Sequence, residues 1–413
     1  MNKPVLVVGA GMAGLSCAVH LQRAGIPSRV FEASDDVGGR VRTDCVNGFL
    51  LDRGFQVYLD AYPETGKLLD LESLDLRGFA PGALVYKEGN LYRLMDVFRR
   101  PNSAIASLRA PIGSFADKLR VGRMRSRLLR SSLAEIASRP DQSTEDYLAS
   151  KGFSGQMIDS FFRSFYGGIF LERELRTSSR MFEFTFKMFG QGSATIPARG
   201  MGQIPKQLAS QLPGGTVSLN TSVAEVSERR VTLETGEQID ASVVVLATDS
   251  SQIGKLLPIS IHPEPRWRSV TNVYFSAKQS PTREAIICLN GSGEGRVNNV
   301  CTLTDAAQDY SPDGRALLSV SVLGLPKEEN LPERIQEELV GWFGTAVNDW
   351  THLRTDVIPR ALPEQLPGVE RNGFQVERGV YVCGDHTLSA SIEGAVISGK
   401  LVAEEIAKND HGK

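Results

Sequence analysis

The chain has 413 residues, of which 41% are hydrophobic and 23% are charged, and its net charge is −2 at pH 7. This length favours two or three domains or one large two-part unit. Beyond the N-terminal strand and helix, no uncharged stretch reaches the roughly 20 residues that cross a bilayer, and we expect no secretion signal. Five cysteines without C-x-x-C spacing and five scattered histidines argue against a disulfide framework and a metal site. We therefore expect a reducing compartment, cytoplasmic or plastid-like, and a protein that is soluble or peripherally membrane-associated.

The chain begins with a pattern that predicts a nucleotide-binding turn. Residues 4–8 predict a buried strand, a helix follows, and the turn between them is Gly9-Ala10-Gly11-Met12-Ala13-Gly14. In such a turn the first glycine allows the bend, the second admits a pyrophosphate, and the third lets the helix pack on the strand. Glu32 follows a second strand, where a carboxylate suits an adenosine ribose. We expect ADP binding; the alternative is a glycine-rich turn without a ligand.

A second glycine pair follows in the segment that runs from Glu32 and Ala33 to Gly38, Gly39 and Arg40. Adjacent glycines leave backbone N–H groups open to a phosphate, and an arginine supplies a fork-shaped cation for it. The segment therefore predicts a further phosphate contact.

The middle of the chain changes from helices to strands. Residues 60–195 predict mainly helices, because cap and breaker signals recur there. Strands are expected at residues 216–220, 224–226, 231–234, 243–247, 273–275 and 316–322, with a helix near 334–343. A buried strand at 379–383 and a helix at 393–406 close the chain.

We expect the C-terminal strand and helix to belong to the same sheet and domain as the N-terminal strands. We therefore predict an α/β fold, with a discontinuous Rossmann-type domain that binds the nucleotide cofactor and an inserted mixed α+β substrate domain. The expected division assigns residues 1–60, 195–258 and 355–413 to the first domain, and residues 61–194 and 259–354 to the second.

Residues 91–130 hold ten Lys and Arg against two Asp, a local charge of +8, so the rest of the chain carries −10. Within this region, residues 114–130 predict a basic amphipathic helix, the type that lies on anionic membrane surfaces. The alternative is a solvated Arg-rich face packed on the domain. No nucleic-acid-binding module accompanies the basic residues, so no nucleic-acid partner is expected.

Eight of the eighteen phenylalanines lie between residues 161 and 189. They indicate either an apolar tunnel for a lipophilic substrate or an ordinary helix core, since pockets and cores have similar compositions.

The C-terminal segment carries the other ligand signals. Gly384 and Asp385 follow a strand, where loops of open α/β sheets reach ligands. A helix that starts near Ser391 would direct its positive end at a flavin ring, which gains negative charge on reduction. His386 is a candidate proton shuttle, the alternative being a local hydrogen-bonding role.

Taken together, G-x-G-x-x-G, E-A-x-x-x-x-G-G-R and the Gly384–Asp385 segment leading to Glu393-Gly394-Ala395 resemble the FAD-dependent amine oxidase and phytoene desaturase superfamily. The resemblance implies a non-covalently bound FAD. Val223 would touch adenine through its backbone, Asp385 would contact the ribityl-pyrophosphate, and Ile392 would offer its N–H to the flavin. The implied FAD-binding residues are Gly9, Gly11, Ala13, Gly14, Glu32, Ala33, Gly38, Gly39, Arg40, Val223, Gly384, Asp385 and Ile392.

Within the superfamily, Gly54-Phe55-Gln56, Ala361-Leu362-Pro363 and the segment 391–400 are similar to plant-type carotene desaturases. This similarity implies desaturation of a hydrophobic, isoprenoid-like substrate, with a quinone or O2 as electron acceptor. The alternatives are an amine oxidase that acts on a C–N bond with O2, and a flavin-bound assembly factor without turnover. Amine oxidases place an aromatic ring just before the E-G-A segment, where this chain has Ser389-Ala390-Ser391.

Overall fold

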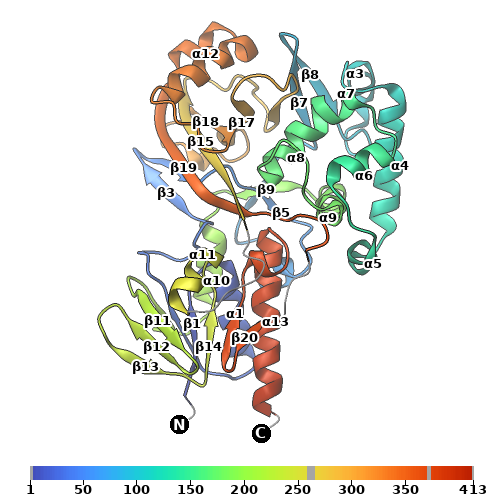
Figure 1. The fold of residues 1–413 in the computed structure, drawn as a ribbon. Coiled ribbons are helices and arrows are strands. Elements are labelled where there is room, and N and C mark those ends of the chain that lie inside the picture. The colour runs from blue at the N-terminus through green and yellow to red at the C-terminus, as the bar shows by residue number, and fades with distance from the viewer. Residues whose placement is uncertain (1–2, 258–265, 370–373, 412–413) are drawn as a thin grey trace.

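The computed structural model describes residues 3–257, 266–369 and 374–411. Figure 1 shows two parts, one built on a six-stranded sheet and the other on a seven-stranded sheet with helices beside it. Both ends of the chain lie at the end of the first part that points away from the second part.

The six-stranded sheet is mostly parallel and gathers strands from three separate regions of the chain. Its order is β10 (Val217–Ser218), β2 (Ser28–Phe31), β1 (Val5–Val8), β14 (Val243–Leu246), β21 (Val380–Val382) and β20 (Gln375–Glu377), of which only β20 is antiparallel to its neighbour. Every side chain of β1 is buried, as its unbroken apolar sequence predicts for a central parallel strand. The α/β prediction with a discontinuous Rossmann-type sheet is confirmed.

Helices from the two ends of the chain pack together beside this sheet (Figure 1). They are α1 (Met12–Arg23) and α13 (Ile392–His411). A Cβ on Gly399 would lie 2.1 Å from the carbonyl oxygen of Ala13, so only glycine permits the approach. Ser16 Oγ donates to the carbonyl of Val396 at 2.8 Å. The N-terminal turn and the C-terminal segment are thus held against each other.

The seven-stranded sheet forms the centre of the second part. Its order is β19 (Thr351–Pro363), β15 (Trp267–Ala277), β18 (Ala316–Leu323), β17 (Val297–Thr302), β16 (Ile287–Asn290), β7 (Gly82–Lys87) and β8 (Asn90–Met95). Neighbouring residues of β16 enter different cores: Cys288 packs with α12 (Leu331–Phe343), and Leu289 packs with the helices of residues 104–191. The sheet therefore separates α12 from those helices.

The helices of residues 104–191 cover the sheet face that carries Leu289. They are α3 (Ala104–Arg109), α4 (Phe115–Arg130), α5 (Leu133–Ser138), α6 (Thr144–Ser150), α7 (Gly155–Met157), α8 (Arg163–Phe170) and α9 (Ser179–Gln191). Ser114 and Asp117 form a capping box at the start of α4, which begins where the basic amphipathic pattern predicts a helix.

Several smaller elements complete the fold. They are the hairpin β3 (Thr43–Val46) and β4 (Phe49–Asp52), the sheet of β5 (Tyr58–Leu59), β9 (Ala194–Pro197) and β6 (Leu76–Gly78), the sheet of β11 (Val223–Ser227), β12 (Arg230–Leu233) and β13 (Gln238–Asp240), and the helices α2 (Thr65–Leu68), α10 (Gln203–Ser210) and α11 (Ser250–Leu256). The hairpin predicted at residues 224–226 and 231–234 is confirmed by β11 and β12.

A buried carboxyl group on β4 holds several of these elements together. Asp52 accepts hydrogen bonds from Thr43 Oγ1 at 2.5 Å, the Met201 N–H at 2.9 Å and the Tyr310 hydroxyl at 2.8 Å. Burial raises the pKa of Asp52 to about 6, and the hydrogen bonds from Thr43 and Tyr310 only partly oppose that rise.

The prediction that residues 60–195 are mainly helical was wrong for residues 76–95, which form β6, β7 and β8. In β7, Ala83 and Val85 are fully buried and lie opposite Ile287 and Leu289 of β16. β16 lies about 200 residues away in sequence, but β7 also pairs with the adjacent β8, with Lys87 opposite Asn90 across a turn at Glu88 and Gly89. This local hairpin signal was missed.

The predicted domain division stays a prediction. Its boundary at residues 354 and 355 falls inside β19, which pairs with β15 from Thr351 to Pro363. We propose that this boundary lies after Pro363, because a strand belongs with the sheet that it extends. The boundary at 258 and 259 lies outside the described residues.

Candidate functional site

The glycine turn between β1 and α1 has a different requirement at each glycine. Gly9 has φ +106°, and a Cβ there would lie 2.8 Å from the carbonyl oxygen of Ala247. A Cβ on Gly14 would lie 2.0 Å from the carbonyl oxygen of Gly9, so Gly14 lets α1 pack on the turn. A Cβ on Gly11 would meet no protein atom within 4 Å, because Gly11 faces a cavity. The turn is thus packed on one side and open on the other.

The first turn of α1 also faces this cavity. The N-cap of α1 is Gly11, no side chain caps it, and no acidic residue lies in the first turn. Met12 and Ala13 line the cavity. The N–H groups of a first helical turn lack intrahelical partners and carry the positive end of the helix dipole. This end of the cavity therefore suits an anionic group such as a pyrophosphate.

Glu32 lies at the end of β2 and also lines the cavity. Its carboxylate accepts the Ala10 N–H at 2.7 Å, the Ser34 N–H at 2.9 Å and the Ser34 hydroxyl at 2.7 Å. These bonds hold a negative charge beside the glycine turn, where it can accept further hydrogen bonds from a ribose.

Gly38 and Gly39 lie against the same turn. Gly38 forms a parallel bridge with Gly11, its N–H donates to the Ala10 carbonyl at 2.8 Å, and its φ is +113°. A Cβ on Gly39 would approach only the Cα of Gly11, at 3.6 Å. The two glycine motifs thus form one cradle without side chains. Cβ atoms at these positions would occupy the space that a ligand can fill.

Arg40 and Asp385 connect this cradle to the C-terminal segment. Arg40 Nη2 lies 2.6 Å from Asp385 Oδ1 and Nη1 lies 2.9 Å from Oδ2, so the pair is bidentate. Nη1 also donates to the carbonyl of Ala361 at 3.0 Å, and the guanidinium lies 5.1 Å from the centre of the Trp267 ring. The phosphate contact predicted for Arg40 stays a prediction, because the side chain already holds Asp385.

The C-terminal segment brings its ligand candidates to the same cavity. Gly384 follows β21, and its N–H donates to Ser398 Oγ at 2.9 Å. His386 is buried and lines the cavity with Ile392, the first residue of α13. Glu393 turns away from the cavity and accepts the N–H groups of Glu64 at 2.8 Å and Thr65 at 2.9 Å. Sequence reasoning missed this role for Glu393, which fixes the start of α13 against α2.

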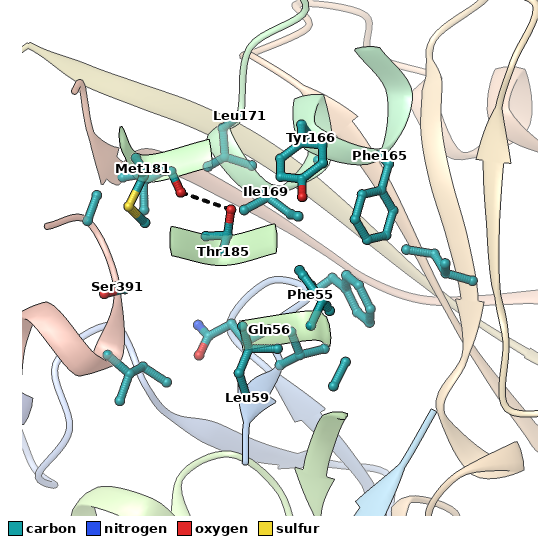
Figure 2. A pocket seen from close by; sticks show the side chains of 18 of the residues that line it. Phe55, Gln56, Leu59, Phe165, Tyr166, Ile169, Leu171, Met181, Thr185 and Ser391 are labelled. Carbon is teal, nitrogen blue, oxygen red and sulfur yellow. Dashed lines mark hydrogen bonds between the residues drawn. The ribbon is translucent and has the colours of Figure 1, made fainter. Parts of the chain in front are cut away.

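The cavity has a volume of about 1470 Å³, above the roughly 300–1,000 Å³ of ordinary ligand pockets. It runs from the glycine cradle to α8, α9 and α4, so it has room for a dinucleotide and a second molecule. Figure 2 shows side chains of its wall at the second end, most of them apolar: Phe55, Leu59, Phe165, Tyr166, Ile169, Leu171 and Met181, with Gln56, Thr185 and Ser391 among them. Thr185 Oγ1 donates a hydrogen bond to the Met181 carbonyl at 3.0 Å. Because this hydroxyl is already satisfied, the cavity wall near it is largely apolar.

The phenylalanine cluster contributes both to the helix core and to the cavity wall. Phe162 and Phe182 are fully buried in the helix core. Other members line the cavity, namely Phe161, Phe165, Phe186 and Phe189. The cluster is therefore a core whose inner side forms the apolar wall.

Most of the predicted FAD-binding residues meet at this cavity: Gly9, Gly11, Ala13, Glu32, Gly38, Gly39, Arg40, Gly384, Asp385 and Ile392 line it. Gly14 lies behind the turn, Ala33 is exposed, and Val223 lies in β11 outside the cavity wall. The cofactor contacts expected for all thirteen residues stay predictions.

Among the described residues that line the cavity, every carboxylate has a partner. Asp96 lies 3.3 Å from Arg125 Nε, and Asp249 lies 3.7 Å from Arg360 Nε. Glu32 and Asp385 are held as described above. The cavity thus presents no carboxylate without a partner, within the described ranges, to a positively charged ligand.

Neither a metal centre nor a reactive thiol is evident beside the cradle. Residues 3–257, 266–369 and 374–411 contain no group of three or more metal-binding side chains. Separately, no helix within these ranges is long and apolar enough to cross a membrane. Cys383 is fully buried in the core, and burial raises the pKa of its thiol to about 12. A thiol in this state is a poor nucleophile.

Comparison with known proteins identifies the family. The family described as flavin containing amine oxidoreductase matches residues 12–407. The chain belongs to this family. It is an FAD-dependent oxidoreductase, and the cradle and open helix end described above fit the dinucleotide part of that cofactor.

Its relatives have varied activities. A 15-cis-phytoene desaturase of Capsicum annuum is 22% identical over 464 residues, covering 98% of this chain and 78% of that protein. Protoporphyrinogen oxidase 2 of Arabidopsis thaliana is 28% identical over 167 residues, which cover 40% of this chain but only 32% of that protein. Among solved structures, an oxidoreductase from Methanosarcina mazei matches with a TM-score of 0.78 at 19% identity, covering 97% of this chain and all of that one. A putrescine oxidase matches with a TM-score of 0.73 at 18% identity, covering 99% of both chains.

Proposed function

We propose that this flavin oxidoreductase desaturates a hydrophobic, isoprenoid-like substrate, which loses a hydride from one carbon and a proton from its neighbour so that a double bond forms. The observation that carries the proposal is the apolar wall of α8 and α9, which continues the same cavity that holds the glycine cradle. The match to a phytoene desaturase along 98% of this chain supports it. FAD, bound non-covalently, would accept the hydride, and a quinone or O2 would take up the electrons.

The chain's own residues supply binding and orientation. The first turn of α1 and the backbone of Gly11 and Gly39 would hold the pyrophosphate, and Glu32 would hold the ribose. The wall of α8 and α9 would orient the apolar substrate and exclude water. His386 stays our only proton-shuttle candidate, and desaturation needs no conspicuous acid–base pair because the cofactor performs the difficult step.

Oxidation of a C–N bond is the second candidate, because a putrescine oxidase shares the fold. Two features favour the neutral hydrocarbon. The segment Ser389-Ala390-Ser391 carries no aromatic ring, and Ala390 and Ser391 line the cavity. Three of the four lining carboxylates among the described residues pair with arginines, and the fourth, Glu32, lies at the glycine turn. A charged amine beside the apolar wall therefore gains little from them.

We also propose that this enzyme contacts a membrane through the surface formed by residues 98–119, from which an apolar substrate would enter. Large apolar side chains are exposed there: Phe98 (61%), Ile105 (65%), Leu108 (46%), Phe115 (62%) and Leu119 (49%). Of these, Phe98, Leu108 and Leu119 also line the cavity, so the cavity reaches the protein surface between them. Apolar residues grouped in this way mark interaction sites.

The charges around this surface agree with an anionic membrane. Arg100, Arg109 and Arg123 are exposed. Other cations of the predicted amphipathic helix are held by the protein itself: Arg127, although partly exposed, lies 2.7 Å from Glu183, and Lys118 donates to two carbonyls of the segment before α4. Fewer cations of residues 114–130 are thus available to a membrane than the sequence predicts. Arg100 and Arg109, which precede this segment, add to the basic surface.

The proposed reaction is tested by its product. The FAD-loaded protein is incubated with an isoprenoid hydrocarbon in vesicles and with a quinone, and the lipids are analysed by mass spectrometry. We expect a product that is lighter by two hydrogens and a reduced quinone. Hydrogen peroxide released from a panel of amines, with no change in the hydrocarbons, would assign the chain to C–N oxidation instead.

A further inference from the structure

A row of buried polar side chains crosses the cavity-facing side of the seven-stranded sheet. Asn272 of β15 lies directly opposite Ser321 of β18, and Ser321 lies opposite Asn299 of β17. Residues opposite one another on neighbouring strands share a face. The three side chains are 0%, 5% and 2% exposed, and Ser321 and Asn299 line the cavity. We call these three residues the amide row.

The surroundings of the amide row are apolar. Leu289 lies opposite Asn299 on the next strand, and Val270, two residues before Asn272, lines the cavity. Ile287 and Ile169 also line it. Aliphatic residues on this face would avoid the free-energy cost of burying polar groups. The three polar side chains are therefore expected to have a polar partner.

The row's own hydrogen bonds leave capacity unused. Ser321 Oγ donates to Asn272 Oδ1 at 3.2 Å, and Asn299 Nδ2 donates to Ser321 Oγ at 3.3 Å. Asn299 Oδ1 accepts from Asn298 Nδ2 at 2.9 Å. Nδ2 of Asn272 has no hydrogen-bond partner among the described residues, although the side chain is fully buried. Each amide nitrogen has two hydrogens to donate, so the row retains donors.

A glycine on α8 lies against one end of the amide row. A Cβ on Gly168 would lie 2.9 Å from Asn298 Nδ2 and 3.1 Å from Asn299 Oδ1. Gly168 itself lines the cavity. Glycine at this position therefore lets α8 pack closely against these amides.

We propose that the amide row binds one neutral oxygen group, a hydroxyl or a carbonyl, carried by an otherwise apolar substrate. Asn299 and Ser321 line the cavity and would bind that oxygen, Asn299 through the second hydrogen of its Nδ2, whereas Asn272 does not line the cavity and holds Ser321 through its Oδ1. The row carries no charge, so a carboxylate would remain without a counter-ion there. This proposal rests on the proposed function, since it assigns a substrate class to the same cavity.

The test compares ligands that differ only in oxygen. Dodecane, dodecan-1-ol and dodecan-2-one compete with the apolar dye N-phenyl-1-naphthylamine for the FAD-loaded protein, and the displacement of the dye gives each affinity. The variant Ser321→Ala removes a hydroxyl that lines the cavity. Ser319→Ala is the matched control, because Ser319 Oγ also donates to Asn272 Oδ1, at 3.0 Å, but does not line the cavity.

We expect Ser321→Ala to weaken binding of the alcohol and the ketone about fivefold to tenfold, as loss of one hydrogen bond does. Binding of dodecane should stay unchanged, and Ser319→Ala should affect all three ligands equally. An unchanged alcohol-to-alkane ratio in Ser321→Ala, or the same loss in both variants, would overturn the proposal and leave the row with ordered water only. This binding assay needs no turnover, so the oxygen preference can hold even where the desaturation test fails.

Discussion

Arg40 and Asp385 lie 345 residues apart in sequence and form a bidentate ion pair, with N–O distances of 2.6 and 2.9 Å. Asp385 is almost fully buried, whereas 39% of the Arg40 side chain is exposed. The pair closes the cradle, because it joins the loop after Gly39 to the loop after β21. Its integrity should therefore govern retention of the cofactor.

The first prediction concerns this pair. Arg40→Lys loses the fork geometry, and Asp385→Asn removes the buried charge, so each variant should retain less FAD after gel filtration and bind it at least about tenfold more weakly. The matched control is the exposed pair of Arg230 and Asp240, where Arg230→Lys should change stability by less than about 1 kcal/mol and leave FAD binding intact. FAD titration by fluorescence quenching measures both. Equal FAD affinity in all of these proteins would refute the closing role of the pair.

The second prediction separates the glycines of the first turn. Gly11→Ala places a Cβ in open space within the cavity, so the protein without cofactor should unfold at an unchanged temperature. FAD binding should weaken by roughly 1–3 kcal/mol, because the methyl group occupies the space of the ligand. Gly14→Ala should instead prevent folding, since its Cβ would lie 2.0 Å from a carbonyl oxygen. Calorimetry with and without FAD distinguishes the two, and a Gly11→Ala protein that binds FAD normally would show that the pyrophosphate lies elsewhere.

The third prediction concerns the pH dependence of stability. Burial raises the pKa of Asp52 to about 6 from an ordinary value of 3.8. The folded protein thus binds this proton more tightly than the unfolded chain, so the contribution of Asp52 is fully present below pH 4 and is lost as pH rises through 6. The difference amounts to roughly 3 kcal/mol. Urea unfolding of the parent protein and of Asp52→Asn at several pH values should show their stability difference move against the parent protein by that order between pH 4 and 7. A constant difference would contradict the raised pKa.

The fourth prediction concerns the surface of residues 98–119. The protein should sediment with vesicles that contain phosphatidylglycerol at low salt and much less with pure phosphatidylcholine, because salt and neutral lipids both weaken the attraction. Phe115→Ser and Leu119→Ser should each lower binding by roughly tenfold, as loss of one buried apolar side chain implies. Leu325→Ser is the control, since Leu325 is similarly exposed (44%) but lies outside this surface. Equal binding of Leu119→Ser and Leu325→Ser would remove the support for docking at this surface.

The sequence predicted the parts of the site whose requirements are local. The glycine turn, the acid after the second strand and the start of α4 each depend on a few neighbouring residues, and the structure has the turn, the strand end and the helix where they were expected. The family resemblance added Gly384, Asp385 and Ile392, which reach the same cavity as the turn.

Other features depend on contacts between distant segments and could not be predicted in this way. The ion pair of Arg40 with Asp385 needs two loops to meet, and the position of the β7–β8 hairpin in the sheet depends on β16, which is distant in sequence. The polar residues of the amide row look unremarkable in sequence, because only the register of β15, β18 and β17 aligns them. Arg127 reads as a solvent-facing cation until the position of Glu183 is known.

The visible absorption spectrum of the purified protein, before and after anaerobic incubation with an organic extract of its host's membranes, tests the central claim most directly. We predict the bands of oxidised flavin in the first spectrum and their bleaching by the extract in the second. A flavin spectrum that no extract bleaches, but that an amine does, would contradict the assignment of an apolar substrate.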